Sequence, residues 1–200
     1  MRLYVGPNSY FNDQWNDLIG SVEDAQGIAA LTRESYRDGS NDSGFLMRFF
    51  RHDQNDELQI TFQLNHSVRN SEARFHLHTI PMVAPSVSPQ NTYWSYYWTI
   101  ASVGGALPRN LASWSSGNLE IPVATGDEFK HQVFSIFNAT IPPTASSSAF
   151  LFVRIIRSGT NPLDTYNTNK AAGTGAANLA IIGLDVHVQL YRPGTVGEFI

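Results

Sequence analysis

The sequence contains no cysteine. Disulfide bonds, thiolate metal sites and cysteine nucleophiles are therefore excluded as features of this protein. The chain has 200 residues, which is enough to bury a core without a disulfide or a metal to stabilise it. No linker and no internal repeat divides it, so we expect residues 1–200 to form a single domain.

Charged residues are scarce, at 15% of the chain against about a quarter in typical globular proteins. The net charge is −4 and no basic run occurs, which argues against nucleic acid and anionic membranes as partners. Of the 13 basic residues only Lys130 and Lys170 are lysines, and the rest are arginines, the cation favoured at protein interfaces. Because a surface poor in charge and lysine disfavours a free monomer, the composition favours stable self-association.

The sequence also lacks long apolar runs. No stretch approaches the ~20 apolar residues that span a bilayer, so no membrane partner is expected. The N-terminus lacks the basic segment followed by an apolar segment that marks a signal peptide. We therefore expect synthesis in a cytoplasm.

Repeated alternation of apolar and polar residues is the dominant pattern, and it is typical of half-buried strands. It is clearest at 58–64. Together with aromatic and β-branched runs, it predicts strands at 45–51, 58–64, 73–83, 92–103, 119–123, 129–137, 149–156 and 179–191. In the last strand we expect one continuous apolar face, made of Ala180, Ile182, Leu184, Val186, Val188 and Leu190.

Turn chemistry separates these strands. Residues 52–56 predict a hairpin between the first two. Pro81 predicts the end of the third, because proline has no N–H to donate to a ladder. About eight strands favour an all-β fold, a two-sheet antiparallel β-sandwich, and the long connection at 159–178 favours the jelly-roll type. At most one short helix fits, at 21–36, where a strand over 28–36 is the competing interpretation.

His76 and His78 are the candidates for a metal site, because residues two apart on a strand share a face. A metal cupin uses such a pair, followed by a Glu and a distant His. No carboxylate follows His78 closely here, and either His131 or His187 would have to be the third ligand. Since a metal site needs three or more convergent ligands, we predict no metal and no other cofactor.

The sequence predicts no catalytic residue. Asp185 and His187 share one face of the last strand, as an orienting acid and a base would. No nucleophile can be assigned to them, and no Gly-x-Ser-x-Gly elbow occurs. The acids lie mostly in turns rather than in the pairs used for glycoside hydrolysis. We therefore predict that the protein is not an enzyme.

The aromatic run at 93–98 is the densest feature of the chain. One face of this strand must point into the core, and the other would expose rings for a protein interface or a sugar platform. Trp94 and Trp98 are our candidates for that surface. A second candidate surface is a C-terminal arm at about 192–200, with contacts from Tyr191, Arg192 and Phe199.

The C-terminal third carries a further pattern. A strand at 151–157 ends in Arg, an Asp-Thr-Tyr loop follows at 164–166, and a strand with Asp-x-His at 185–187 precedes Gly194. Over about fifty residues this resembles a pattern that recurs in small tailed-bacteriophage virion proteins and in the ends of some phage tail proteins. The resemblance implies a virion-associated homo-oligomer, with a trimer favoured.

Our first interpretation is therefore a non-enzymatic structural protein of a tailed-phage virion, a capsid decoration or cement protein. It would bind itself and other virion proteins through buried area, and assembly would be its mechanism. The alternative is a tail-fibre or receptor-binding module that recognises a host surface glycan. A second alternative is a cupin-type metal-dependent enzyme using His76 and His78.

Overall fold

The computed structural model is built from ten strands and one short 3-10 helix over the residues that it describes. These are residues 14–21, 32–38, 41–64, 68, 72–142, 145, 148–167 and 177–190. The strands are β1 (Gln14–Ser21), β2 (Thr32–Asp38), β3 (Asn41–Arg51), β4 (Asn55–Gln63), β5 (Glu72–Pro81), β6 (Gln90–Ala101), β7 (Ser115–Val123), β8 (Gln132–Thr140), β9 (Phe150–Ser158) and β10 (Ala177–Leu190). The 3-10 helix η1 is Leu111–Ser113. No helix of the described residues is long and apolar enough to cross a membrane.

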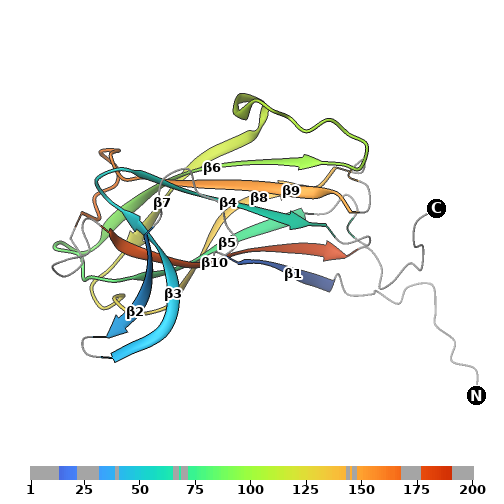
Figure 1. Cartoon of the computed structure of the whole chain (residues 1–200). Helices are drawn as coiled ribbons and strands as arrows, with labels where there is room; N and C mark the ends of the chain where they lie inside the picture. The colour runs from blue at the N-terminus through green and yellow to red at the C-terminus, as the bar shows by residue number, and fades with distance from the viewer. Residues whose placement is uncertain are drawn as a thin grey trace, which may run out of the picture.

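The strands form two antiparallel sheets that pack face to face (Figure 1). One sheet has the order β2-β3-β10-β5-β8, with β1 paired to the second half of β10. The other has the order β4-β9-β6-β7. The quartets β3-β10-β5-β8 and β4-β9-β6-β7 are the two sheets of a jelly roll, and β1 and β2 extend the first of them. The predicted two-sheet jelly-roll sandwich is confirmed.

All eight predicted strands are present, as β3 to β10. The predicted hairpin between the first two is wrong, because β3 pairs with β2 and β10 whereas β4 pairs with β9. The turn between them carries the chain from one sheet to the other. Asp56 closes this turn by accepting hydrogen bonds from the backbone N–H of Arg51 at 2.7 Å and from its guanidinium at 2.6 Å. Phe50 and Leu58 can then both be buried between the sheets.

β10 changes face part-way along its length. Its ladder with β5 shifts register between Ile181 and Gly183. Ile181 and Leu184 both point into the core, whereas Ala180 and Ile182 join an apolar cluster with Met47, Phe49 and Met82. The predicted single apolar face is therefore wrong, because an extra residue in the ladder reverses the alternation.

Pro81 ends β5 as predicted, and its carbonyl accepts a hydrogen bond from the backbone N–H of Phe129 at 2.8 Å. The stretch 21–36, for which helix and strand are the two alternatives, contains the first five residues of β2, so the strand interpretation is confirmed for residues 32–36. The remainder, residues 22–31, lies outside the described part of the chain.

A buried arginine joins the two sheets. Arg157 of β9 is fully buried, and its guanidinium binds both carboxylate oxygens of Asp164 at 2.8 and 2.9 Å. The same guanidinium donates to the carbonyls of Phe50 and Tyr166 and to the side-chain oxygen of Asn178. All five N–H groups of an arginine are thereby used. The Arg and Asp-Thr-Tyr positions of the C-terminal pattern therefore meet Asn178 in one structural network.

Candidate functional site

One candidate surface is the outer face of the four-stranded sheet. Trp94 of β6 does not belong to it, because this side chain is only 1% exposed and its indole N–H donates to Thr92 Oγ at 2.8 Å in the core. The prediction of Trp94 as a surface residue is wrong. Both faces of β6 carry rings, and the pleat that buries Trp94 turns its neighbour Tyr93 outward. Trp98 shares the inward side, is partly exposed and packs against the core, so its role in binding stays a prediction.

The rings that do reach this face come from three segments. Tyr93 and Tyr97 lie on the outward side of β6, and both are partly exposed. Phe152 of β9 alternates with buried neighbours and therefore shares that side. Its ring centroid is 6.4 Å from that of Trp114, which precedes β7, and 6.3 Å from that of Phe150. The aromatic surface thus extends from β6 across to the start of β9.

Polar side chains separate these rings. Ser95, between the two tyrosines of β6, donates to Asn118 Oδ1 at 2.7 Å. Arg154 lies opposite the second tyrosine in register, and its Nε donates to Glu57 at 2.9 Å. Glu120, opposite the first tyrosine, is exposed. Hydrogen-bonding groups of both kinds, donors and acceptors, therefore lie among the rings rather than around them.

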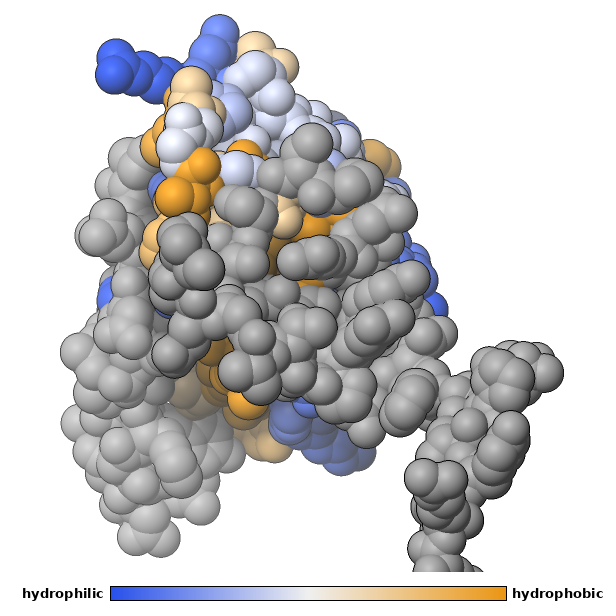
Figure 2. All heavy atoms as spheres, turned by 90° about the vertical axis from the view of Figure 1, so that its right-hand side faces the viewer, coloured by the Kyte–Doolittle hydropathy of each residue, from blue (hydrophilic) through white to orange (hydrophobic). Residues whose placement is uncertain are grey.

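The same sheet ends in exposed apolar side chains where β6 finishes and β9 begins. Val103, Leu107 and Phe150 are 69%, 46% and 43% exposed. Figure 2, which looks onto this end of the sandwich, shows hydrophobic surface among hydrophilic described residues. This end continues the aromatic face toward the loop that carries η1.

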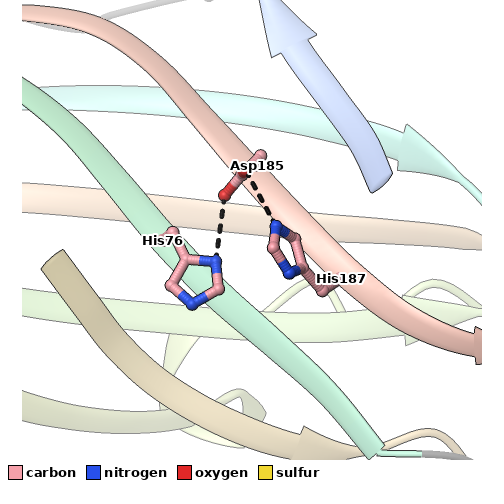
Figure 3. A group of neighbouring side chains, drawn as sticks. All are labelled: His76, Asp185 and His187. Atoms are coloured by element: carbon pink, nitrogen blue, oxygen red, sulfur yellow. Dashed lines mark hydrogen bonds and ion pairs between the residues drawn. The ribbon is translucent and has the colours of Figure 1, made fainter. Parts of the chain in front are cut away.

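A second candidate site lies on the outer face of the other sheet, where β5 and β10 pair. Asp185 is opposite His76 in register, and His187 follows two residues later on β10. His76 Nδ1 is 3.3 Å from Asp185 Oδ1, and His187 Nε2 is 3.2 Å from Asp185 Oδ2. One nitrogen or oxygen atom from each residue lies within 4.8 Å of those from the other two. Figure 3 shows the carboxylate connected by a dashed line to each of the two imidazoles.

Neighbouring groups extend this cluster. His78 Nε2 is 3.2 Å from Asp185 Oδ2, and His78 Nδ1 is 2.8 Å from His131 Nε2. Asp17 of β1 approaches His187 Nε2 at 3.4 Å. Neither His78 Nε2 nor Asp185 Oδ1 has a partner aligned for a hydrogen bond, although both atoms are buried. The short distances therefore do not satisfy the hydrogen-bonding capacity of these groups.

The predicted His76 and His78 pair does share a face. Asp185 and His187, predicted to share one face of the last strand, also lie together, with His187 Nε2 3.2 Å from Asp185 Oδ2. Of the two histidines considered as a third ligand, His187 joins His76, whereas His131 contacts His78. The sequence has no carboxylate shortly after His78, and in the structure Asp185 supplies one beside the histidine pair. No spacing along the chain could identify it, because it comes from the neighbouring strand.

The cluster faces away from the interior of the sandwich. His76 and His78 alternate with Phe75 and Leu77, which are fully buried between the sheets. The space between the sheets at this level is filled with apolar side chains, so the histidines do not line an enclosed active site there. A cupin-type enzyme gains no support from this geometry.

Three predicted contact residues, Tyr191, Arg192 and Phe199, lie outside the described residues, as does the arm at 192–200. They stay predictions.

No protein family model matches this chain, and no curated protein sequence matches it. Several solved structures are similar in fold. CBM35 from Cellvibrio japonicus is 11% identical over 90% of this chain and 100% of its own, with a TM-score of 0.43. The mannan-recognising carbohydrate-binding module TmCBM27 is 10% identical over 87% and 98%, with a TM-score of 0.40. A cycloisomaltooligosaccharide glucanotransferase from Paenibacillus sp. is 9% identical over 86% of this chain and 18% of its own, with a TM-score of 0.47.

At these identities the comparisons assign no ligand and no activity to this chain. The topology of its own sheets defines the class, a jelly-roll β-sandwich. The virion location, the capsid role and the homo-oligomer remain predictions from the sequence.

Proposed function

We propose that this protein is a non-enzymatic binding module, and that its ligand is a carbohydrate held on the outer face of the four-stranded sheet. The observation that carries the proposal is the placement of Ser95, Asn118 and Arg154 among the rings of Tyr93 and Tyr97. A sugar ring has an apolar face of C–H groups and a rim of hydroxyls. Aromatic rings contact the first, and hydroxyl, amide and guanidinium groups bind the second.

A protein partner fits this surface less well. The centre of a protein interface is depleted of charge and apolar, with polar groups at its rim. Here the Arg154 and Glu57 ion pair and the Ser95 and Asn118 hydrogen bond lie within the aromatic area. Covering them with an apolar partner would desolvate polar groups without replacing their contacts with water, whereas sugar hydroxyls replace those contacts.

The spacing of the tyrosines indicates the size of the ligand. Tyr93 and Tyr97 are four residues apart on β6, which corresponds to about 13 Å along a strand. This distance is longer than one sugar ring. The face is therefore suited to an oligosaccharide or to part of a glycan chain, rather than to a monosaccharide.

Glycan-array screening of the full chain, followed by calorimetric titration of the best oligosaccharide, tests this proposal. We expect saturable binding that Tyr97→Ala weakens by about fivefold or more, since an aromatic stacking contact contributes about 1–3 kcal/mol. Phe129→Ala is the matched control, because Phe129 is an exposed ring (52%) outside this surface. Circular dichroism would verify that both variants are folded.

Two results would contradict the proposal. One is the absence of saturable binding to any glycan on the array. The other is an affinity that Tyr97→Ala and Phe129→Ala lower equally, because the binding would then not depend on this face.

A further inference from the structure

We infer that His76, Asp185 and His187 form a binding site for a divalent transition-metal ion, and that Zn²⁺ is the ion that fits best. Two imidazoles and one carboxylate from a rigid sheet are a ligand set that zinc accepts in proteins. Magnesium and calcium prefer oxygen ligands throughout, so a set dominated by imidazole nitrogen disfavours them. The site lies on the sheet opposite to the proposed carbohydrate face, and the inference does not depend on that proposal.

The ligand groups are close enough together to converge on one zinc ion. Bonds of about 2.0–2.1 Å in a tetrahedral arrangement place two ligand atoms about 3.3 Å apart. The structure has 3.3 Å between His76 Nδ1 and Asp185 Oδ1, and 3.2 Å between His187 Nε2 and the other carboxylate oxygen, Oδ2. One ligand atom from each of the three residues lies within 4.8 Å of those from the other two, so side-chain rotations that bring them closer together would be needed to enclose an ion.

The hydrogen bonds of the cluster are incomplete in a way that a cation would correct. Asp185 Oδ1 is buried without an aligned donor, although three histidines surround its carboxylate. Burying an ionised carboxylate oxygen without a partner is costly. A positive ion at this position would stabilise the charge directly.

His78 also has an unsatisfied polar atom beside the proposed site, whichever ring nitrogen carries its proton. Its Nδ1 is 2.8 Å from His131 Nε2. If His78 carries its proton on Nδ1, the lone pair of its Nε2 faces Asp185 Oδ2 at 3.2 Å, which is repulsive without a cation nearby. If it carries the proton on Nε2, that N–H is buried and misaligned with the carboxylate. Either tautomer leaves an unsatisfied polar atom beside the proposed site.

The sheet holds the ligands in place. His76 and Asp185 are directly opposite each other in the β5–β10 ladder, and the register shift at Ile181 and Gly183 sets this alignment. Three protein ligands leave a fourth tetrahedral position for water or an external donor. A depression of about 150 Å³ borders Asp185 and is lined by Ile19, His78, Ile182, Gly183 and Leu184.

Calorimetric titration of the chelator-treated full chain with ZnCl₂ tests this inference, with Co²⁺ absorption as a report on coordination. We expect one equivalent of Zn²⁺ to bind, and a Co²⁺ spectrum of four-coordinate type. His187→Ala and Asp185→Asn should each weaken binding by at least about 100-fold, because loss of even a hydrogen-bond partner of a metal ligand costs about 10–100-fold. His52→Ala, a histidine in the turn between β3 and β4, is the matched control and should bind Zn²⁺ as the parent does.

A thermal melt separates loss of metal from loss of fold. Zn²⁺ at 100 times its Kd should raise the Tm of the parent by about 5–10 °C, and should leave the Tm of Asp185→Asn unchanged. No zinc binding by the parent would overturn the inference. Equal affinity of the parent and Asp185→Asn would also overturn it. Tyr97→Ala should bind Zn²⁺ as the parent does. Failure of the carbohydrate proposal can therefore be distinguished from failure of the zinc inference.

Discussion

Removal of the Asp164 carboxylate should destabilise the fold more than most single substitutions. Asp164→Ala deletes both charge-assisted hydrogen bonds to Arg157, at 2.9 and 2.8 Å, and one from the backbone N–H of Tyr93 at 3.1 Å. The guanidinium would remain fully buried, at 0% exposure. A buried charge without its counter-ion is the main source of the expected loss.

The magnitude follows from the burial of both partners. Breaking a buried ion pair by removing one member costs about 3–5 kcal/mol, and one unsatisfied backbone N–H adds about 1 kcal/mol. We therefore expect the free energy of unfolding to fall by about 4–6 kcal/mol. This is a large part of the roughly 5–15 kcal/mol typical of a domain. For a chain of this length it corresponds to a Tm lower by about 8–24 °C.

Urea unfolding monitored by tryptophan fluorescence measures this change. Glu72→Ala is the control, because it removes an ion pair of similar length, 3.1 Å to Arg74, whose two side chains are 48% and 37% exposed. That variant should lose less than about 1 kcal/mol. The double variant R157M/D164L should be more stable than Asp164→Ala, since apolar replacement of both members removes the unpaired charge. Equal loss in Asp164→Ala and Glu72→Ala would refute the reasoning.

Three further outcomes are expected. Burial raises the pKa of Tyr166 from 10.0 to about 12, so the folded state holds this proton more tightly than the unfolded state, and stability should fall as pH rises from 10 to 12. The free energy of unfolding should fall by about 1.4 kcal/mol per pH unit in the parent, and this fall should be absent in Tyr166→Phe. The same dependence of the free energy of unfolding on pH in the two proteins, measured with urea, would argue against this effect. Gly159→Ala should cost about 1–3 kcal/mol, because a Cβ would lie 2.6 Å from the carbonyl oxygen of Gln54 and 2.7 Å from that of Arg51; an unchanged Tm would contradict this clash. Phe137→Ala should cost about 3–5 kcal/mol and reduce the near-UV circular dichroism, because the ring is 8% exposed and stacked between two others; a parent-like near-UV spectrum would show that the stack is not formed.

The positions of the strands could be predicted because burial of one face imposes period-two alternation, most clearly at 58–64. Their partners could not. Alternation at 45–51 and 58–64 is the same whether the strands pair edge to edge or pack face to face. The buried Phe50 and Leu58 show that the second arrangement satisfies both patterns. The turn-forming residues at 52–56 are therefore not sufficient evidence for a hairpin.

The candidate sites were predictable to different degrees. His76 and His78 were found because their spacing alone puts them on one face. Asp185 joins them only through the register of β10, which depends on a shift beside Gly183 that no spacing records. In β6 the sequence has rings on both faces, so alternation alone does not indicate which face is buried. Trp94 is buried because its indole N–H donates to the hydroxyl of Thr92 and because its ring packs against the opposite sheet.

The placement of β10 has a consequence for how the chain folds. β10 is the last of the described strands along the chain, yet it lies between β5 on one side and both β3 and β1 on the other. Neither β1 nor β3 has a ladder with β5, so this sheet cannot close until residues 177–190 have been synthesised. Pairing over such sequence separations is slow, in the range of milliseconds to seconds. A chain stopped at residue 176 would expose three unpaired edges and should aggregate in sedimentation experiments.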